Sequence, residues 1–218
     1  MSFLFNWLNE IIFVYFNNSN KKIMQKRLDI SDTLIHFIRA ETKEAAFSKL
    51  LEIIDSGILK GSSNMIKGSY NCVCFTETPV AIIKKDGFNR MQFQDFGIIF
   101  NKKDLFTKGA RPVIYQTDEE YEFLADQIKW KHVKYDLSTQ NKVDWTHERE
   151  WRIKTDSINI LNFNFSLLFP DTNWENEYIN SCENQVEMYS LIMDELLAHQ
   201  YIEAFPTTVV ADSIKTHD

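Results

Sequence analysis

The sequence contains little cysteine. Its 218 residues include three cysteines, which are too few for a disulfide scaffold. Cys72 and Cys74 lie two residues apart, a spacing poorly suited to a bridge between them. No second Cys or His pair follows them at zinc spacing, so we expect no metal site. Reduced thiols are typical of a cytoplasmic protein, which is the localisation we expect.

Glycine is also scarce, and its distribution excludes several enzyme classes. The six glycines never form GxGxxG or GxxxxGK, so neither a dinucleotide fingerprint nor a phosphate loop is present. The chain also lacks a GxSxG elbow, an HExxH zinc motif and a kinase signature. Any chemistry must therefore come from a site without these motifs.

No long hydrophobic run is present. The first sixteen residues, MSFLFNWLNEIIFVYF, come nearest, but polar residues interrupt them and the run is too short to span a bilayer. They lack the early positive charge and small-residue cleavage site of a secretory signal. We expect residues 1–30 to be an N-terminal helical extension that packs on the domain or self-associates. The basic cluster at residues 21–27 keeps membrane contact as the alternative.

Positive charge is not in excess. The net charge of −7 argues against a broad nucleic-acid-binding surface, because phosphate binding needs clustered Lys and Arg. A local basic groove stays compatible with this charge. Hydrophobic content of 44% with seventeen Phe predicts a folded protein, and the length suits one domain over residues 31–218.

The predicted elements mix helices and strands without regular βαβ alternation, which favours an α+β fold. Helical spacing and end signals predict helices over residues 42–56, 118–130 and 183–198. Alternating or β-branched runs predict strands over residues 33–39, 70–75, 97–100, 112–115 and 206–211, with a strand pair within 157–169 and a loop over 58–68.

The segment Trp145–Ile153 (WTHEREWRI) carries the strongest functional signal. If it is extended, Glu148, Glu150 and Arg152 share one face, because side chains alternate along a strand. Two carboxylates so close raise the pKa of one of them, which suits a base that works near neutral pH. A cleft and a solvated edge strand are both compatible with this pattern.

His36 is the second candidate, because it interrupts an apolar strand directly before a helix. A polar group there must face a cleft or find a hydrogen-bond partner in the core. His132 and His199 are expected to be ordinary surface or core histidines with satisfied hydrogen bonds.

Several motifs in order resemble the AbiGi-type abortive-infection family, bacterial anti-phage proteins labelled as putative antitoxins. They are LIHFIR around His36, IIDSGIL, CVCFTETP, FGIIFNKKDLF, RPVIY and HEREW, all within residues 33–155. An acidic residue follows the Cys-Phe pair in that pattern, and Glu77 stands in this region here.

A wider resemblance is to DarT-type and other ADP-ribosyltransferase folds. It implies two packed sheets with flanking helices, and NAD in the cleft between the sheets. By position, it makes His36 the contact to the nicotinamide ribose, Glu150 the catalytic carboxylate and Glu148 the upstream acid of the pair.

The resemblance leaves the remaining NAD contacts open among several side chains. Arginine matches phosphate oxygens well, and aromatic rings can stack on nicotinamide. The candidates for the pyrophosphate are Arg39, Arg149 and Arg152, and those for the nicotinamide are Tyr70, Phe75 and Tyr115.

Two functions follow as hypotheses. One is an NAD-dependent transferase that modifies a protein or nucleic-acid acceptor in phage defence. The other is a non-catalytic antitoxin or sensor that binds a cognate partner protein. A nuclease using Mg²⁺ is a third interpretation, but no spacing singles out the available acids Asp95, Asp104 and Asp144.

Overall fold

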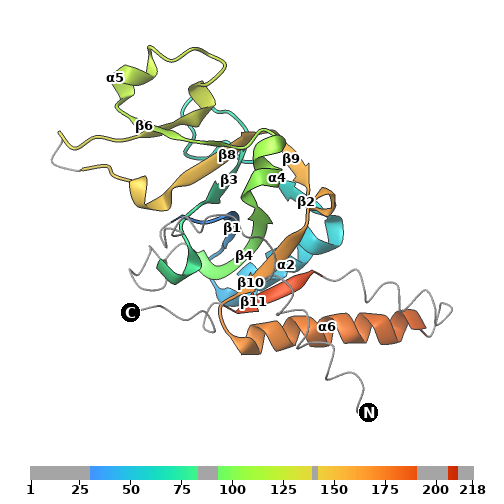
Figure 1. Ribbon diagram of the computed structural model, residues 1–218. Helices are drawn as coiled ribbons and strands as arrows, with labels where there is room; N and C mark the ends of the chain where they lie inside the picture. Colours follow the sequence, from blue (N-terminus) through green and yellow to red (C-terminus); the bar gives the residue numbers. More distant parts are fainter. Residues whose placement is uncertain (1–29, 83–92, 139–141, 191–205, 211–218) are drawn as a thin grey trace, which may run out of the picture.

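A seven-stranded mixed sheet forms the centre of the computed structural model, which describes residues 30–82, 93–138, 142–190 and 206–210 (Figure 1). The strand order is β11-β10-β4-β1-β3-β8-β5, and only β10 and β11 run parallel. These strands are β1 (Thr33–Arg39), β3 (Cys72–Thr76), β4 (Phe93–Asn101), β5 (Arg111–Pro112), β8 (Glu150–Lys154), β10 (Phe165–Phe169) and β11 (Thr207–Val210).

Two small sheets and several helices complete the described part, so the fold is α+β, as predicted. The small sheets pair β2 (Ile58–Lys60) with β9 (Ser157–Asn159), and β6 (Ile114–Gln116) with β7 (His132–Lys134). The helices are α2 (Lys43–Ser56), α4 (Lys102–Thr107), α5 (Asp118–Tyr121) and α6 (Thr172–Ser190), with 3-10 turns η2 (Lys129–Lys131), η3 (Thr146–Glu148) and η4 (Ile160–Asn162). Over the described ranges, none of these helices combines the length and apolar character needed to cross a membrane.

The predicted helix after β1 is confirmed, together with both of its end signals. The Thr42 hydroxyl accepts a hydrogen bond from the backbone N–H of Ala45, which satisfies one of the free donors of the first turn. Gly57 ends the helix in the left-handed conformation at φ 66°, which glycine adopts without a Cβ clash. The strand β1 that precedes this helix has the predicted bounds.

Helices α2 and α6 pack on the same face of the sheet, joined by a cluster of three aromatic rings. Phe47 of α2 lies 5.9 Å from Phe96 of β4 and 5.2 Å from Trp174 of α6, measured between ring centroids. Phe96 and Trp174 are 5.3 Å apart in an edge-to-face arrangement. Such pairs add stability beyond the area they bury, so this face holds the main core.

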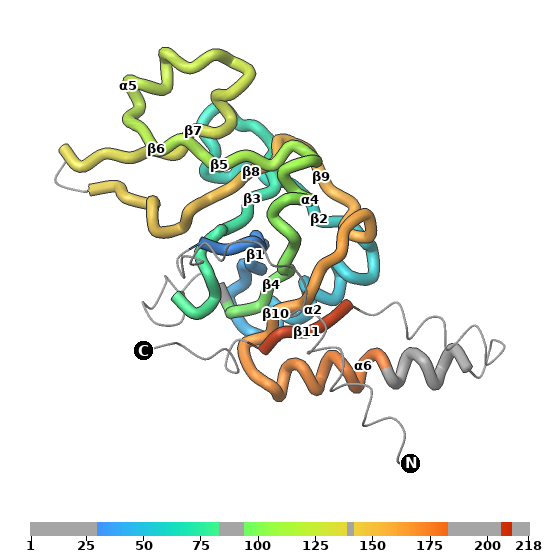
Figure 2. Tube along the Cα trace, viewed as in Figure 1, coloured from blue at the N-terminus to red at the C-terminus, as the bar shows by residue number. Residues whose placement is uncertain are grey.

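The sheet is weakly joined between β1 and β3, at a place that we call the seam. Strand β1 pairs with β4 through six residue pairs, whereas β1 and β3 share one pair, Ile35 with Thr76. Strands β4, β10 and β11 lie beyond β1, and β8 and β5 lie beyond β3. Figure 2 shows the chain of β3 and β8 leading away from β1 toward β5, β6 and β7.

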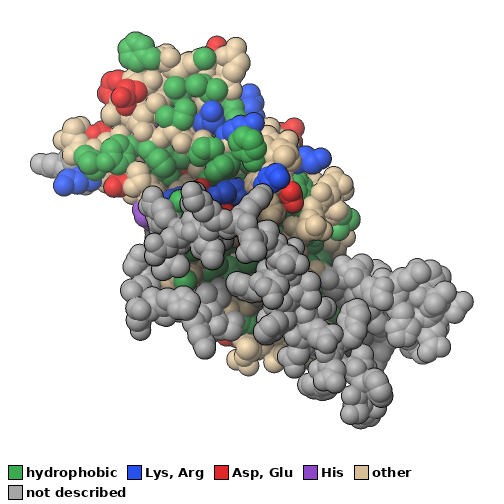
Figure 3. Space-filling model, viewed as in Figure 1, with side chains coloured by type: hydrophobic (Ala, Val, Ile, Leu, Met, Phe, Trp, Pro, Cys, Tyr) green, Lys and Arg blue, Asp and Glu red, His purple; other side chains and the backbone are tan. Residues whose placement is uncertain are grey.

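The predicted helix over residues 118–130 is wrong beyond Tyr121. The chain continues in turns instead, and Phe123 is 88% exposed. The buried residues of this stretch are Tyr121 and Trp130, and Trp130 packs on Ile66 and Cys72. Their burial bends the chain back to form β7, so tertiary packing overrides the local helical spacing. Figure 3 shows hydrophobic side chains gathered on this upper part of the visible face.

The predicted strand over residues 112–115 divides into two. Residues Arg111–Pro112 pair with β8, while Ile114–Gln116 pair with β7 in another sheet. The strands expected within 157–169 both exist, but β9 pairs with β2 and β10 with β4 rather than with each other. The predicted loop over 58–68 begins with β2, since its residues complete the pair with β9.

Other predicted elements are found with shifted bounds. The strand predicted over residues 70–75 is found as β3, and the one predicted over 97–100 is found as the longer β4. The last predicted strand, over 206–211, is found as β11. Helix α6 begins at Thr172 rather than residue 183. Residues 1–29 of the expected extension, and His199, lie outside the described residues.

Candidate functional site

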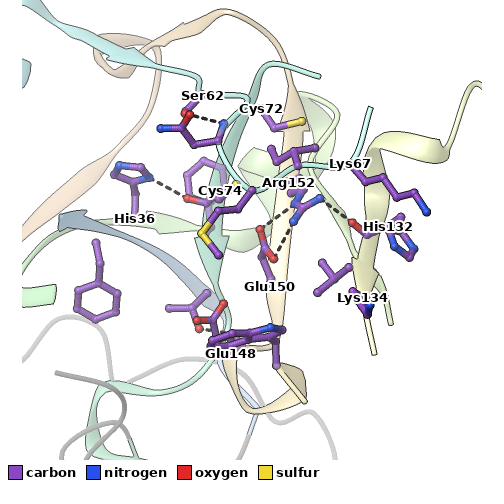
Figure 4. A pocket seen from close by; sticks show the side chains of 18 of the residues that line it. His36, Ser62, Lys67, Cys72, Cys74, His132, Lys134, Glu148, Glu150 and Arg152 are labelled. Carbon is purple, nitrogen blue, oxygen red and sulfur yellow. Dashed lines mark hydrogen bonds and ion pairs between the residues drawn. The ribbon is translucent and has the colours of Figure 1, made fainter. Parts of the chain in front are cut away.

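A cavity of about 780 Å³ lies over the seam. Its walls come from β1, β3, β7 and β8, from the loop after β2, and from the turn before β8. The histidine and charged side chains that line it include His36, Arg39, Lys67, Asp118, His132, Lys134, Glu148, Glu150 and Arg152. Figure 4 shows His36 on one side of this space, Glu148 and Glu150 below, and His132 with Lys134 on the other side.

Strand β8 places Glu150 and Arg152 in the cavity wall. Alternation along the strand turns Trp151 and Ile153 to the other face, where they contact the main core. Because both faces are specified, a shift of one residue would bury the charges and expose the core side chains. The prediction that Glu150 and Arg152 share a face is confirmed.

Glu148 reaches the same cavity by a different route than predicted. The segment before β8 is not extended: Thr146–Glu148 form a 3-10 turn, and Arg149 adopts a left-handed conformation at φ 44°. The condition of an extended run is therefore met from Glu150 onward but not before it, because this turn redirects the chain. Glu148 still lines the cavity together with Glu150.

Side chains from β3, from the segment just after it and from β6 fix the backbone of this turn. The Thr76 hydroxyl donates to the Glu148 carbonyl, and the Thr78 hydroxyl donates to the His147 carbonyl at 2.8 Å. The backbone N–H of Glu150 donates to the Tyr115 hydroxyl at 2.9 Å. These bonds satisfy buried backbone groups and hold the Glu148 and Glu150 backbone in place.

Glu150 forms a two-point ion pair with Arg152. The guanidinium donates from Nε to Oε1 at 2.8 Å and from Nη2 to Oε2 at 3.1 Å. Its Nη1 donates to the carbonyl oxygens of Trp130 and His132, at 3.0 and 2.9 Å. Arg152 is 4% exposed and directs its donors to protein groups, so it orients Glu150 and is poorly placed for a ligand phosphate.

The pKa of the Glu148 carboxyl is raised. Burial is the largest cause, because it disfavours the charged form, and the negative charge of Glu150 adds to it. The positive charge of Arg39 acts in the opposite direction. Glu148 is therefore a half-buried carboxyl whose proton affinity is shifted toward neutral pH.

His36 lies at the seam and bonds across it. Its Nδ1 lies 2.8 Å from the Cys74 carbonyl oxygen, and its ring packs edge-on against Phe75 at 6.0 Å between centroids. Burial, with a smaller contribution from Arg39, lowers the His36 pKa, so the ring is neutral at pH 7. A neutral ring that donates from Nδ1 to a carbonyl leaves Nε2 as a hydrogen-bond acceptor.

The other predicted contacts divide into those that reach the cavity and those that do not. Arg39 and Phe75 line it, although Phe75 is 3% exposed and packs mainly in the core. Tyr115 does not line it, because its hydroxyl accepts the Glu150 N–H; burial raises the pKa of that hydroxyl to about 12. Tyr70 and Arg149 also lie outside the cavity lining.

Two features were missed by sequence reasoning. Glu77 accepts from Trp151 Nε1 at 2.8 Å and pairs with Lys102 at 2.8 Å, which anchors β8 from its core side. The only sequence signal was its place after the Cys-Phe pair. His132 was expected to have satisfied hydrogen bonds, but neither ring nitrogen has a hydrogen-bond partner although the residue is 3% exposed.

The cavity lining is positive although the chain is negative. Five cationic side chains, Arg39, Lys60, Lys67, Lys134 and Arg152, face three carboxylates, in a chain of net charge −7. Asp95, Asp104 and Asp144 do not line the cavity, and the described residues contain no group of three His, Cys, Asp or Glu placed to hold a metal ion. This balance favours an anionic ligand.

Comparisons with known proteins gave no assignment: the chain matches no protein-family model, and searches of curated proteins and of solved structures found no match.

Proposed function

We propose that this chain is an NAD-consuming, ADP-ribosyltransferase-like protein of bacterial anti-phage defence that acts in the cytoplasm. One observation carries the proposal: His36 of β1 and the pair Glu148 and Glu150 line the same cavity. That arrangement is the one expected from the resemblance to ADP-ribosyltransferase folds. The seam supports the same reading of the fold, since it divides the sheet into two parts with the cavity over their junction.

The chemistry assigned to Glu150 is charge stabilisation. When the bond between nicotinamide and ribose breaks, its electron pair leaves with nicotinamide and positive charge develops on the sugar. A fixed carboxylate beside the sugar stabilises that charge as it grows. Arg152 orients the Glu150 carboxylate by two hydrogen bonds, so the carboxylate needs no reorganisation during the reaction.

Glu148 is assigned the role of general base. The acceptor must lose a proton as it bonds to the ribose carbon, and Glu148 is the carboxyl whose raised pKa suits that transfer. It is not joined to Arg152 by the ion pair that holds Glu150. The two acids therefore divide into Glu150, which an ion pair holds in place, and Glu148, whose raised pKa suits proton transfer.

His36 and the cationic lining are assigned to binding NAD. The Nε2 acceptor of His36 can receive a hydrogen bond from a ribose hydroxyl, while Nδ1 stays bonded to Cys74. The excess of Lys and Arg in the lining suits the two negative charges of the pyrophosphate, and Arg39 is the exposed arginine among them. A cavity of about 780 Å³ is large enough for a nucleotide of this size.

The same geometry supports a second function, that of a non-catalytic antitoxin or sensor that binds a cognate partner. The observation in its favour is the Glu150–Arg152 ion pair, since a carboxylate bound to a buried arginine has part of its charge neutralised. In that case the cavity would bind a nucleotide without cleaving it.

Incubation with adenylate-labelled NAD and candidate protein, DNA and RNA acceptors distinguishes the two. The transferase releases nicotinamide and labels an acceptor, and Glu150→Gln abolishes both, while Glu52→Gln on the exposed side of α2 leaves both unchanged. Turnover that survives in a folded Glu150→Gln protein rejects the transferase. Binding of NAD without nicotinamide release by the wild-type chain supports the sensor.

A further inference from the structure

The end of the cavity next to β7 contains a polar cluster whose members have no individual role in the proposed chemistry. Its members are Lys67 from the loop after β2, Asp118 at the start of α5, and His132 and Lys134 of β7, all in the cavity lining. Figure 4 shows Lys67, His132 and Lys134 together on the side of Arg152 away from His36.

His132 is buried without hydrogen bonds. It is 3% exposed, neither ring nitrogen has a hydrogen-bond partner, and its Nε2 lies 3.6 Å from Asp118 Oδ1, beyond hydrogen-bond distance. Burial and the charge of Lys67 lower its pKa and outweigh the opposing effect of Asp118, so the ring is neutral at pH 7 and keeps one N–H donor. An unsatisfied buried polar group is rare and destabilising, so this donor points to a ligand.

The Asp118 carboxylate lies where three donors converge. It accepts from Lys67 at 2.8 Å and pairs with Lys134 at 3.0 Å, and His132 is the third group beside it. The two lysine contacts lower the pKa of Asp118 to about 2, so it is an anion throughout the physiological range. Lys67 also lies 4.0 Å from the Glu122 carboxylate, whose side chain is 67% exposed, so two lysines are balanced by two carboxylates. Lys60 in the same lining supplies the excess positive charge.

We propose that Lys67, His132 and Lys134 form a binding subsite for a phosphate group, in which the Asp118 carboxylate occupies the position of the anion. Two lysines and one neutral histidine supply separate donors from different directions. That set suits a phosphate, whose tetrahedral oxygens point in different directions. A planar carboxylate is better matched by an arginine, which donates two parallel hydrogen bonds to its two oxygens. The subsite stands whether or not the Glu148 and Glu150 end is catalytic.

Calorimetric titration with inorganic pyrophosphate tests the subsite without any NAD turnover. Lys134→Met removes one donor from a side chain that is 47% exposed, so the fold is retained, and we expect Kd to rise about tenfold. Asp118→Asn removes the competing charge, so we expect Kd to fall about tenfold. Lys108→Met, at an exposed lysine after α4, is the matched control and leaves Kd unchanged.

Opposite changes in Kd for the Lys134 and Asp118 variants support the subsite. No binding of pyrophosphate by the wild-type chain, or equal Kd values in all four proteins, overturns it. A second titration with ADP-ribose identifies the source of the phosphate. Competition with pyrophosphate assigns the subsite to the nucleotide in the same cavity, and simultaneous binding assigns it to a phosphate of a second molecule; both outcomes support the subsite.

Discussion

The carboxylate of Glu150 and the guanidinium of Arg152 form one buried unit on the cavity face of β8, with side chains 13% and 5% exposed. Removing one partner leaves the other as an uncompensated buried charge, which is strongly destabilising. The pair is therefore a structural element as well as a part of the site.

Because Glu150 and Arg152 form a pair, we expect their substitutions to have non-additive effects on the free energy of unfolding. We expect Arg152→Met to lower the free energy of unfolding by about 3–5 kcal/mol, since it strands the Glu150 charge. The double variant Arg152→Met/Glu150→Met should recover much of that loss. Urea denaturation of the two single variants and the double variant measures the coupling. Additive losses would show that the pair contributes no interaction of its own.

Glu77 is expected to support β8 from the core side. Glu77→Gln keeps the size of the side chain but weakens its bonds to Trp151 and Lys102, so the free energy of unfolding should fall by about 1–3 kcal/mol. Thermal denaturation with tryptophan fluorescence follows the change at Trp151. Glu119→Gln at an exposed position of α5 is the control. A loss no larger than that of the control would argue against an anchoring role.

His36 can be tested with two substitutions that separate binding from packing. An Asn side chain can still donate to the Cys74 carbonyl but has no acceptor at the position of Nε2, so His36→Asn should weaken NAD binding about tenfold with stability largely kept. His36→Ala also loses the contact with Phe75 and should lower stability as well. Equal NAD affinity in wild type and His36→Asn would assign His36 to the core alone.

The raised pKa of Glu148 predicts a pH dependence of activity and of stability. A general base acts when deprotonated, so nicotinamide release should rise with pH through the raised pKa of Glu148, and Glu148→Gln should remove that limb.

The contribution of Glu148 to stability falls as pH rises, whereas its contribution to activity increases. Its folded pKa lies above the unfolded value, so its contribution is fully present below the unfolded pKa and is lost as pH rises through the folded pKa. Glu148→Gln should therefore flatten the stability profile over that interval. An unchanged profile in the variant would show that Glu148 does not titrate there.

The sequence predicted local structure best where one residue type dictates it. Thr42 and Gly57 mark the ends of α2 by hydrogen bonding and by a left-handed φ, and both signals lie within the helix's own sequence. The helix predicted over residues 118–130 was wrong beyond Tyr121 because the burial of Trp130 depends on Ile66 and Cys72, which are distant in sequence. The spacing of residues within one segment gives no information about that contact.

The candidate site was predicted only in part from the sequence, because some of its contacts also join residues that are distant in sequence. Alternation along β8 placed Glu150 and Arg152 correctly, but the turn that brings Glu148 to the cavity depends on the hydroxyls of Thr76 and Thr78 from another segment. The missing hydrogen bonds of His132 arise from packing and from its distance to Asp118, so they have no sequence signature.

The single residue pair that joins β1 to β3 has a consequence for how the protein can be studied. A molecule that touched His36 on one strand and Glu150 beyond the other would fasten the two parts of the sheet together at their weakest junction. Occupancy would then raise the melting temperature, because binding to the folded chain alone adds to its stability. Thermal-shift screening of nucleotides can therefore find a ligand before any reaction is known.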